Sequence, residues 1–177
     1  KIIFVHPASG DAGTAIGAAL YGYYKWGNHK NFGQSILKKP YLGKSYSDTE
    51  IQQALHRFSN AVNFHKVTSK QLVKQAAEEL KAGKILGWYQ GGAETGPRAL
   101  GHRSILANPT IPDIKDILNQ RIKFRERFRP FAPSVLAEYA RDYFNFHGQE
   151  HPYMLLVCDV KQHKREIIPG VTHVDGS

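Results

Sequence analysis

The stretch Thr68–Gly92, TSKQLVKQAAEELKAGKILGWYQGG, contains the signals that decide the fold class. Thr68 and Gln71 have the spacing of a capping box, which predicts the start of a helix. Apolar residues follow at helical spacing, and Gly83 predicts the end of this helix. Residues 84–90 then predict a strand. A helix followed at once by a strand is typical of α/β folds.

The same alternation extends to both sides of this stretch. Further helices are expected at residues 14–26, 48–58, 113–122 and 137–144. Further strands are expected at residues 2–5, 104–107, 132–136, 153–160 and 171–174. Residues 27–47 show no period and are expected to form a loop. Strands that alternate with helices predict an α/β sheet.

Composition narrows the class of protein. Of the 177 residues, 41% are hydrophobic and 22% are charged, which argues against a disordered or collagen-like chain. The single cysteine, Cys158, excludes an internal disulfide framework and is expected to be a small core residue. No apolar run reaches the roughly 18 residues of a membrane-spanning helix, and no signal-peptide pattern opens the chain. We therefore expect a cytoplasmic protein with no membrane partner.

The charge balance points to anionic partners. Twenty-four lysines and arginines against 15 acidic residues give a net charge of +9. Nucleic acid, phosphorylated small molecules and acidic membrane surfaces all satisfy this balance.

A first candidate site is a turn of small residues at the start of the helix expected from residue 14. Gly10, Gly13 and Gly17 would let the backbone approach a nucleotide closely, and Asp11 has the carboxylate of a metal ligand. The alternative is purely structural: Asp11 caps a helix that packs tightly through residues 17–19.

A second candidate site is the glycine-rich segment 91–104, which follows an expected strand. Arg98 and Arg103 on this segment make it a plausible phosphate cradle. The alternative is a surface turn with solvated arginines.

A third candidate site is the basic run 121–131. In an extended chain its alternate cations would form one continuous face, suited to a polyphosphate or a nucleic-acid backbone. In a helix a single stripe of arginines would form instead, and a merely solvated basic face is the remaining alternative. The neighbouring Phe128, Pro130 and Phe131 predict that Arg129 is held between aromatic rings. The five cations are Arg121, Lys123, Arg125, Arg127 and Arg129.

Two histidines, His147 and His151, have the i, i+4 spacing of a helical metal pair. Gly148 lies between them and Pro152 follows, so a stable helix is not expected there, and metal binding by this pair is weakly supported.

Taken together, these motifs closely resemble those of the NodU/CmcH-type O-carbamoyltransferases. The resemblance lies in residues 7–20, 91–104, 119–134 and 172–176. It implies an actin/Hsp70-like ATPase domain that holds iron, joined to a YrdC-like twisted α/β domain. It also implies that carbamoyl phosphate and ATP give carbamoyl-adenylate, from which the carbamoyl group passes to a hydroxyl of a small-molecule acceptor.

The same resemblance implies a domain division. Residues 1–60 would be the C-terminal part of the ATPase-like domain, and residues 61–177 a truncated YrdC-like domain. Both sites would then be incomplete, so this fragment is expected to be inactive alone and to hold no iron, because the family's paired metal histidines lie upstream.

The resemblance also assigns roles position by position. Asp11 resembles the metal ligand, and Gly10, Gly13 and Gly17 lie in the nucleotide-contacting turn. Arg98, Lys123 and Arg129 resemble the catalytic residues that grip carbamoyl phosphate and the adenylate. Arg103 and Arg125 are further candidate substrate-binding residues.

The rival hypothesis is a non-catalytic basic α/β module that binds RNA or DNA. The sequence argues against it because exposed aromatic residues do not alternate with arginines in an obvious stacking pattern. Nucleic acid is therefore not the expected partner, and a homo-oligomer is left open.

Overall fold

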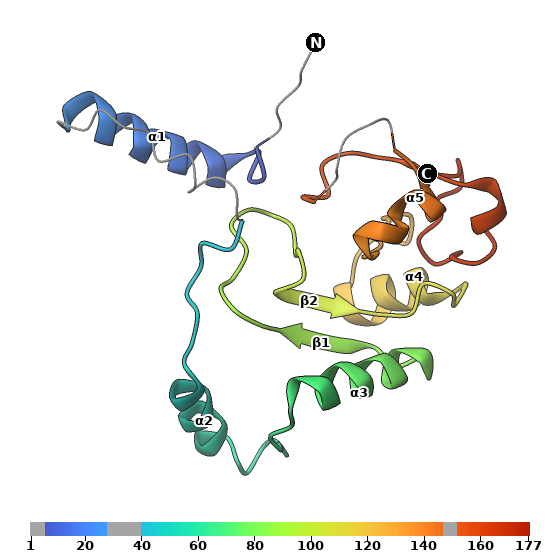
Figure 1. The fold of residues 1–177 in the computed structure, drawn as a ribbon, viewed down its shortest axis with the longest axis horizontal. Helices are drawn as coiled ribbons and strands as arrows, with labels where there is room; N and C mark the ends of the chain where they lie inside the picture. Colours follow the sequence, from blue (N-terminus) through green and yellow to red (C-terminus); the bar gives the residue numbers. More distant parts are fainter. Residues whose placement is uncertain (1–5, 28–39, 147–151) are drawn as a thin grey trace. The chain divides into compact units, whose positions relative to one another are not determined.

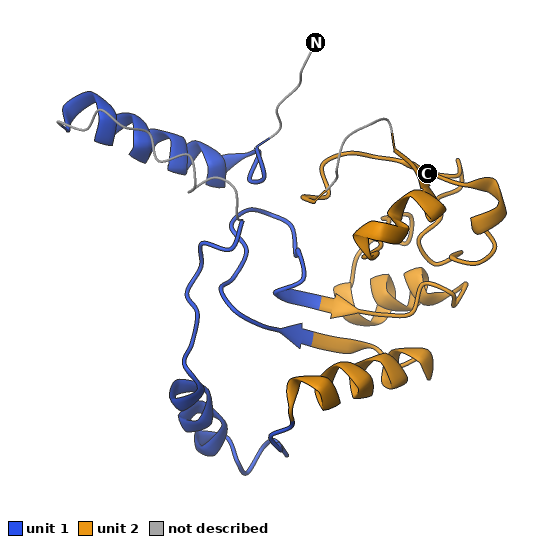
Figure 2. Ribbon diagram, viewed as in Figure 1, with its two compact units in different colours: residues 1–67, 88–104 blue, residues 68–87, 105–177 orange. Residues whose placement is uncertain are grey.

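The computed structural model describes residues 6–27, 40–146 and 152–177 (Figure 1). They belong to two compact units (Figure 2). Unit 1 comprises Lys1–Val67 and Trp88–Ser104, and unit 2 comprises Thr68–Gly87 and Ile105–Ser177. The strand expected at residues 2–5, most of the loop expected at 27–47 and the pair His147 and His151 lie outside the described residues.

Unit 1 contains two helices, α1 (Asp11–Trp26) and α2 (Asp48–Arg57). In α2, the capping box joins Ser47 and Glu50: the Glu50 N–H donates to Ser47 Oγ (3.3 Å), and the Ser47 N–H donates to Glu50 Oε2 (2.9 Å). The helix expected at residues 48–58 is therefore confirmed.

The helix α1 differs from its prediction at its start. It begins at Asp11 instead of Thr14, because Gly10 takes the capping position with φ of 145° and no side-chain cap. Asp11 thus lies inside the first turn and is not the cap. Among the described residues no residue of α1 is buried, so the structural alternative, a helix packed tightly through residues 17–19, is not observed there. Trp26 is 77% exposed at its end.

Unit 2 opens with α3 (Ser69–Lys81), which forms as the sequence predicts. The Gln71 N–H donates to Thr68 Oγ1 (3.3 Å), and the Thr68 N–H donates to Gln71 Oε1 (3.0 Å). Gly83, with φ of +83°, follows the helix end as expected. The capping signal and the glycine therefore set the two ends of α3.

Two short strands follow, β1 (Leu86–Tyr89) and β2 (Arg103–Leu106), and they form a two-stranded sheet. The strands run in opposite directions (Figure 1). Trp88 on β1 is half-buried, and Tyr89 beside it is 58% exposed. Both strands were predicted, within two residues of their observed ends.

The helix expected at residues 113–122 changes type along its length. It begins as α4 (Ile114–Ile117) and continues as a π-helical turn, η2 (Leu118–Lys123). Phe124 ends the turn in the left-handed conformation, with φ of 48°. This widened turn brings Asn119 into a fully buried position.

The remaining expectations for unit 2 are only partly met. Residues 132–136 are irregular, because Pro133 lacks the N–H that a strand ladder requires. The expected helix at 137–144 is a 3-10 turn η3 (Ala137–Tyr139) followed by α5 (Ala140–Tyr143).

The expected strand at 153–160 is reduced to β4 (Asp159–Val160), which pairs antiparallel with β3 (Phe144–Asn145). Met154 has φ of 54°, which interrupts the extended chain. A 3-10 turn, η4 (Gln162–Lys164), follows, and residues 171–174 form turns instead of a strand. The Val171 N–H bonds to the Ile168 carbonyl (3.2 Å).

A small core forms around the β3–β4 pair. Phe144, Val160 and Ile168 are buried, and Cys158 packs against them as predicted. Burial raises the pKa of the Cys158 thiol. The described chain is thus mixed α/β, but its strands form two separate pairs instead of one sheet. In the part of the chain that the structure describes, no helix combines the length and apolarity needed to cross a membrane.

Candidate functional site

Two segments hold most of the sequence-predicted site residues. The glycine-rich loop, residues 91–104, belongs to unit 1 and carries Arg98 and Arg103. The basic segment, residues 119–131, belongs to unit 2 and carries Lys123, Arg125 and Arg129. The convergence of the three proposed catalytic cations on one ligand stays a prediction, because they are divided between the two units.

The glycine-rich loop is organised by the carboxylate of Glu94. Its Oε1 accepts the backbone N–H groups of Leu100 (2.7 Å), His102 (2.8 Å) and Arg103 (3.1 Å). Desolvation raises the pKa of Glu94, but these backbone donors together outweigh it and lower the pKa to about 2. Glu94 is therefore a carboxylate at neutral pH and ties the two ends of the loop together.

Arg98 lies on the segment that Glu94 closes. Its side chain is exposed and has no hydrogen bond or ion pair with any described residue. Gly96 fixes the preceding backbone, with φ of +112°, and an added Cβ there would lie 3.1 Å from the Cβ of Ala8. The loop thus presents one unpaired cation on an ordered backbone.

The guanidinium of Arg103, by contrast, forms hydrogen bonds with backbone groups of the protein. Its Nη1 donates to the carbonyl oxygens of Gln90 (2.7 Å) and His102 (3.0 Å), and its Nη2 donates to that of Gly91 (3.0 Å). The guanidinium also lies 3.4 Å from the centre of the Tyr89 ring. Arg103 therefore supports the loop with the donors that a substrate would otherwise take.

The contacts of Arg103 extend to a cation–aromatic cluster, which we define as Lys44, Tyr46, Tyr89 and Arg103. The rings of Tyr46 and Tyr89 lie 6.5 Å apart, and Lys44 Nζ lies 4.6 Å from the Tyr46 ring centre. Tyr46 is 47% exposed. Exposed aromatic side chains do alternate with cations here, contrary to the reading from sequence.

The basic segment is organised by the amide of Asn119, which is fully buried. Its Nδ2 donates to the carbonyl oxygens of Arg127 (3.3 Å) and Arg129 (2.9 Å), and its Oδ1 accepts from Arg125 Nε (2.6 Å). The Arg125 guanidinium also lies 4.6 Å from the Phe131 ring centre. The cation that the aromatic residues hold is therefore Arg125, not Arg129 as expected.

The other cations of this segment differ in what they contact. Arg127 Nη2 pairs with Asp116 (2.5 Å), and this partner raises the pKa of Arg127. Arg129 Nη1 lies 3.7 Å from Glu126, with both side chains largely exposed. Lys123 is exposed without an ion pair among the described residues.

The single basic face expected for this segment is wrong in both of its forms. The chain is neither extended nor helical throughout, because η2 ends at Lys123 and Phe124 reverses the backbone. Arg121 is exposed at the end of η2, while Arg125 turns inward toward Asn119. The cations of the segment therefore point to different environments.

The turn before α1 is tight but open to solvent. An added Cβ on Gly13 would clash with the Ala8 carbonyl oxygen, whereas Gly10 and Gly17 have no heavy atom within 4 Å of such a Cβ. Asp11 is exposed. Within the described residues, no three histidine, cysteine, aspartate or glutamate side chains gather as a metal site. Asp11 by itself does not fit an iron centre.

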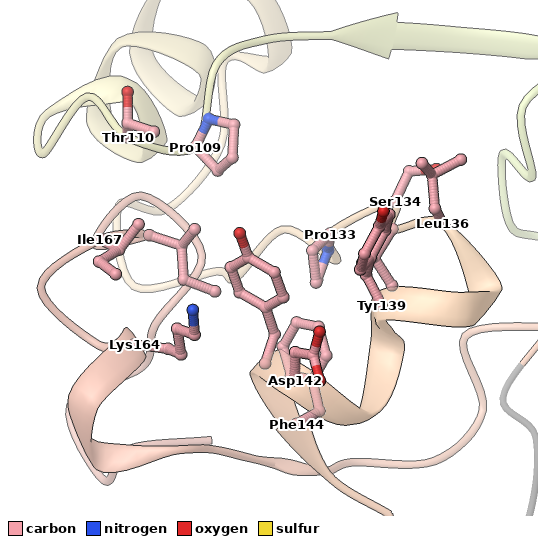
Figure 3. A pocket seen from close by; sticks show the side chains of 13 residues that line it. Pro109, Thr110, Pro133, Ser134, Leu136, Tyr139, Asp142, Phe144, Lys164 and Ile167 are labelled. Carbon is pink, nitrogen blue, oxygen red and sulfur yellow. The ribbon is translucent and has the colours of Figure 1, made fainter.

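Unit 2 also contains a mostly apolar hollow of about 520 Å³ (Figure 3). Its lining includes Pro133, Leu136, Tyr139 and Ile167, with Lys164 at one side. Leu136 and Tyr139 are 63% and 52% exposed. Sequence reasoning missed this hollow, because it forms between turns far apart along the chain.

Glu94 and Asn119 were also missed as organising residues. The available signal was local: Glu94 is the one acidic residue in a run of glycines and cations, and Asn119 is a polar residue at an apolar helical position. Their partners depend on turn geometry, which the sequence pattern does not specify.

Comparison with known proteins places these segments in a family. Residues 77–177 match the family model described as Carbamoyltransferase C-terminus. The chain is 41% identical to nodulation protein NolNO of Sinorhizobium fredii, over 99% of this chain and 26% of that protein. It is 38% identical to nodulation protein NolO of Bradyrhizobium diazoefficiens, over 99% of this chain and 32% of that protein.

A further relative is an uncharacterized protein of Synechocystis sp., 37% identical over 100% of this chain and 32% of that protein. The chain therefore spans about a quarter to a third of the length of these curated relatives.

Proposed function

Because the chain belongs to the carbamoyltransferase C-terminal family, we propose that it binds carbamoyl phosphate and ATP within an ATP-dependent O-carbamoyltransferase. The observation that carries the proposal is Arg98, an exposed and unpaired cation on a loop whose backbone Glu94 fixes. A free guanidinium on a fixed backbone favours binding of a compact anion, because only the side-chain torsions have to be ordered on binding.

The proposed reaction balances with one water molecule. Hydrolysis of carbamoyl phosphate gives carbamate and phosphate. A carbamate oxygen then attacks the α-phosphorus of ATP, and pyrophosphate leaves with the bonding electrons. The product, carbamoyl-adenylate, passes its carbamoyl group to a hydroxyl of a small-molecule acceptor and releases AMP.

In this proposal Arg98, Lys123 and Arg129 bind the negative charge of the phosphate groups. Arg98 and Lys123 are free to do so. The ion pair of Arg129 with Glu126 is exposed, and exposed pairs contribute only about 0–1 kcal/mol, so an anionic substrate can replace it. Arg103 and Arg125 donate hydrogen bonds within their own units. In this proposal each would stabilise the shape of its own segment.

The N-terminal part of the proposal concerns residues 1–60, as the tail of an actin/Hsp70-like ATPase domain. Gly10, Gly13 and Gly17 would allow a nucleotide close to the turn before α1. Since the described residues around Asp11 do not assemble an iron site, no step is assigned to iron.

The test is the carbamoyl-phosphate-dependent activity of the full-length protein that contains this chain. Arg98→Ala, Lys123→Ala and Arg129→Ala should each lower kcat/KM by roughly 100-fold or more, as expected for charged contacts to a substrate. Arg121→Ala and Arg127→Ala are the matched controls, with expected losses below about threefold. Equal, shallow losses across all five variants would contradict the proposal.

A second candidate function, binding of single-stranded nucleic acid, is favoured by the cation–aromatic cluster of Lys44, Tyr46, Tyr89 and Arg103. Exposed aromatic rings beside cations can stack bases, at about 1–3 kcal/mol per base. On this alternative, Tyr89→Ala would weaken binding of single-stranded RNA or DNA at least roughly fivefold. Each basic residue removed would reduce the salt slope by about one unit. An affinity unchanged in Tyr89→Ala would rule out this candidate.

A further inference from the structure

The glycine-rich loop contains a carboxylate that the proposed chemistry does not use. Glu94 Oε1 accepts three backbone N–H groups, from Leu100, His102 and Arg103, at 2.7–3.1 Å. These bonds connect residue 94 with residues that follow the segment 95–99. They therefore close that segment into a loop.

Other contacts fix the same segment from outside. The Tyr41 hydroxyl donates to the Leu100 carbonyl oxygen (3.0 Å), and the Thr95 N–H donates to the carbonyl oxygen of Pro40 (2.5 Å). Arg98 lies between these attachment points and is exposed. The backbone on both sides of Arg98 is thus held while its guanidinium stays free.

The carboxylate does not neutralise the cation that it helps to hold. The bonds of Glu94 Oε1 go to backbone donors, and Arg98 has no ion pair among the described residues. Because the pKa of Glu94 is lowered to about 2, the carboxylate stays ionised and the loop stays closed at neutral pH.

We propose that Glu94 is a positioning residue, which closes the segment 95–99 and thereby holds Arg98 in place for an anionic substrate. The inference rests on the proposed function, in which Arg98 binds carbamoyl phosphate. Holding the backbone on both sides of Arg98 removes its backbone ordering from the cost of binding, so that only the side-chain torsions are ordered when the substrate arrives. The effect of losing Glu94 on substrate binding should consequently depend on the presence of Arg98.

A double-mutant cycle in the full-length protein tests this. Glu94→Ala should raise the KM for carbamoyl phosphate roughly tenfold at nearly constant kcat, as expected when a bound anion loses a pre-organised partner. Arg98→Ala should raise it further. In the double variant Glu94→Ala should add less than about twofold to the effect of Arg98→Ala. Glu138→Ala, which removes an exposed glutamate, is the matched control.

A further variant and a binding assay complete the double-mutant cycle. Glu94→Gln retains an uncharged oxygen acceptor and should give a KM between those of the wild type and Glu94→Ala, which covers the case in which the alanine variant does not fold. The same cycle, measured by calorimetry with inorganic phosphate as the probe, provides a readout without turnover.

The outcomes separate the two proposals. A full effect of Glu94→Ala in the Arg98→Ala background, or wild-type constants in Glu94→Ala, would overturn the positioning role alone. No carbamoyl-phosphate-dependent turnover in the wild type, with a non-additive phosphate-binding cycle, would overturn the proposed function alone. Wild-type behaviour of Arg98→Ala in both assays would overturn both.

Discussion

Replacing Asn119 with alanine would remove the side chain around which the basic segment folds. Three hydrogen bonds would be lost: two from Nδ2 to the carbonyl oxygens of Arg127 and Arg129, and one from Arg125 Nε to Oδ1. Neutral bonds contribute about 1 kcal/mol each and a bond to a charged group about 1.5–3 kcal/mol. Since Arg125 is half-exposed and can turn to water, we expect the local opening free energy to fall by about 3 kcal/mol.

Hydrogen exchange measures this loss at the site itself. The Arg125 N–H bonds to the Asn119 carbonyl oxygen (3.0 Å), so its protection reports the closed segment. A fall of about 3 kcal/mol should accelerate exchange across residues 119–131 by roughly 100-fold in Asn119→Ala.

The matched control is Asn108→Ala. Among the described residues its Oδ1 accepts from the N–H and hydroxyl of Thr110 and from no group of the basic segment, so the change should leave exchange in that segment as it is in the wild type. Wild-type protection of residues 119–131 in Asn119→Ala would refute the reasoning, because the segment would then hold its shape without the buried amide.

Three further changes have defined outcomes. The pKa of Glu94 is lowered from an ordinary 4.5 to about 2, so its carboxylate stabilises the glycine-rich loop fully above about pH 4.5. This stabilisation is lost as the pH falls toward 2, so the stability of the wild type should decline more steeply across this range than that of Glu94→Gln. Thr68→Ala should cost α3 about 1 kcal/mol in local hydrogen exchange, with Ser69→Ala nearly neutral, and equal losses would contradict the capping box. Gly96→Ala should cost more than about 1 kcal/mol in the same assay, because of its positive φ and the nearby Ala8, whereas a stabilised variant would show that the loop can relax.

The sequence predicted best what is decided within a few residues. The start of α3 depends on Thr68 and Gln71, and its end on Gly83, so these bounds could be stated in advance. Residues 132–136 and 153–160 failed as strands because their pairing requires distant partners, and Pro133 and Met154 limit the pairing locally. The family resemblance, which depends on long motifs, is confirmed by the match of residues 77–177.

For the candidate site, the sequence identified the cations but not their separate environments. Arg98 and Arg103 are alike in type and neighbourhood, yet one is free and the other donates to three carbonyl oxygens. Arg125 and Arg129 differ as well: Arg125 donates to the buried Asn119, whereas Arg129 forms an exposed ion pair with Glu126. Which arginine forms internal hydrogen bonds depends on turn geometry, because a positive φ at one residue changes the direction of the next side chain.

The two tryptophans of the chain give it a built-in optical reporter. Trp26 at the end of α1 is 77% exposed, whereas Trp88 on β1 is half-buried and precedes Tyr89 of the cation–aromatic cluster. Acrylamide should therefore quench Trp26 emission first and leave the shorter-wavelength emission of Trp88. After Trp26→Phe, the tryptophan fluorescence of this chain comes from Trp88 alone. Its emission then follows events beside the glycine-rich loop without any attached dye.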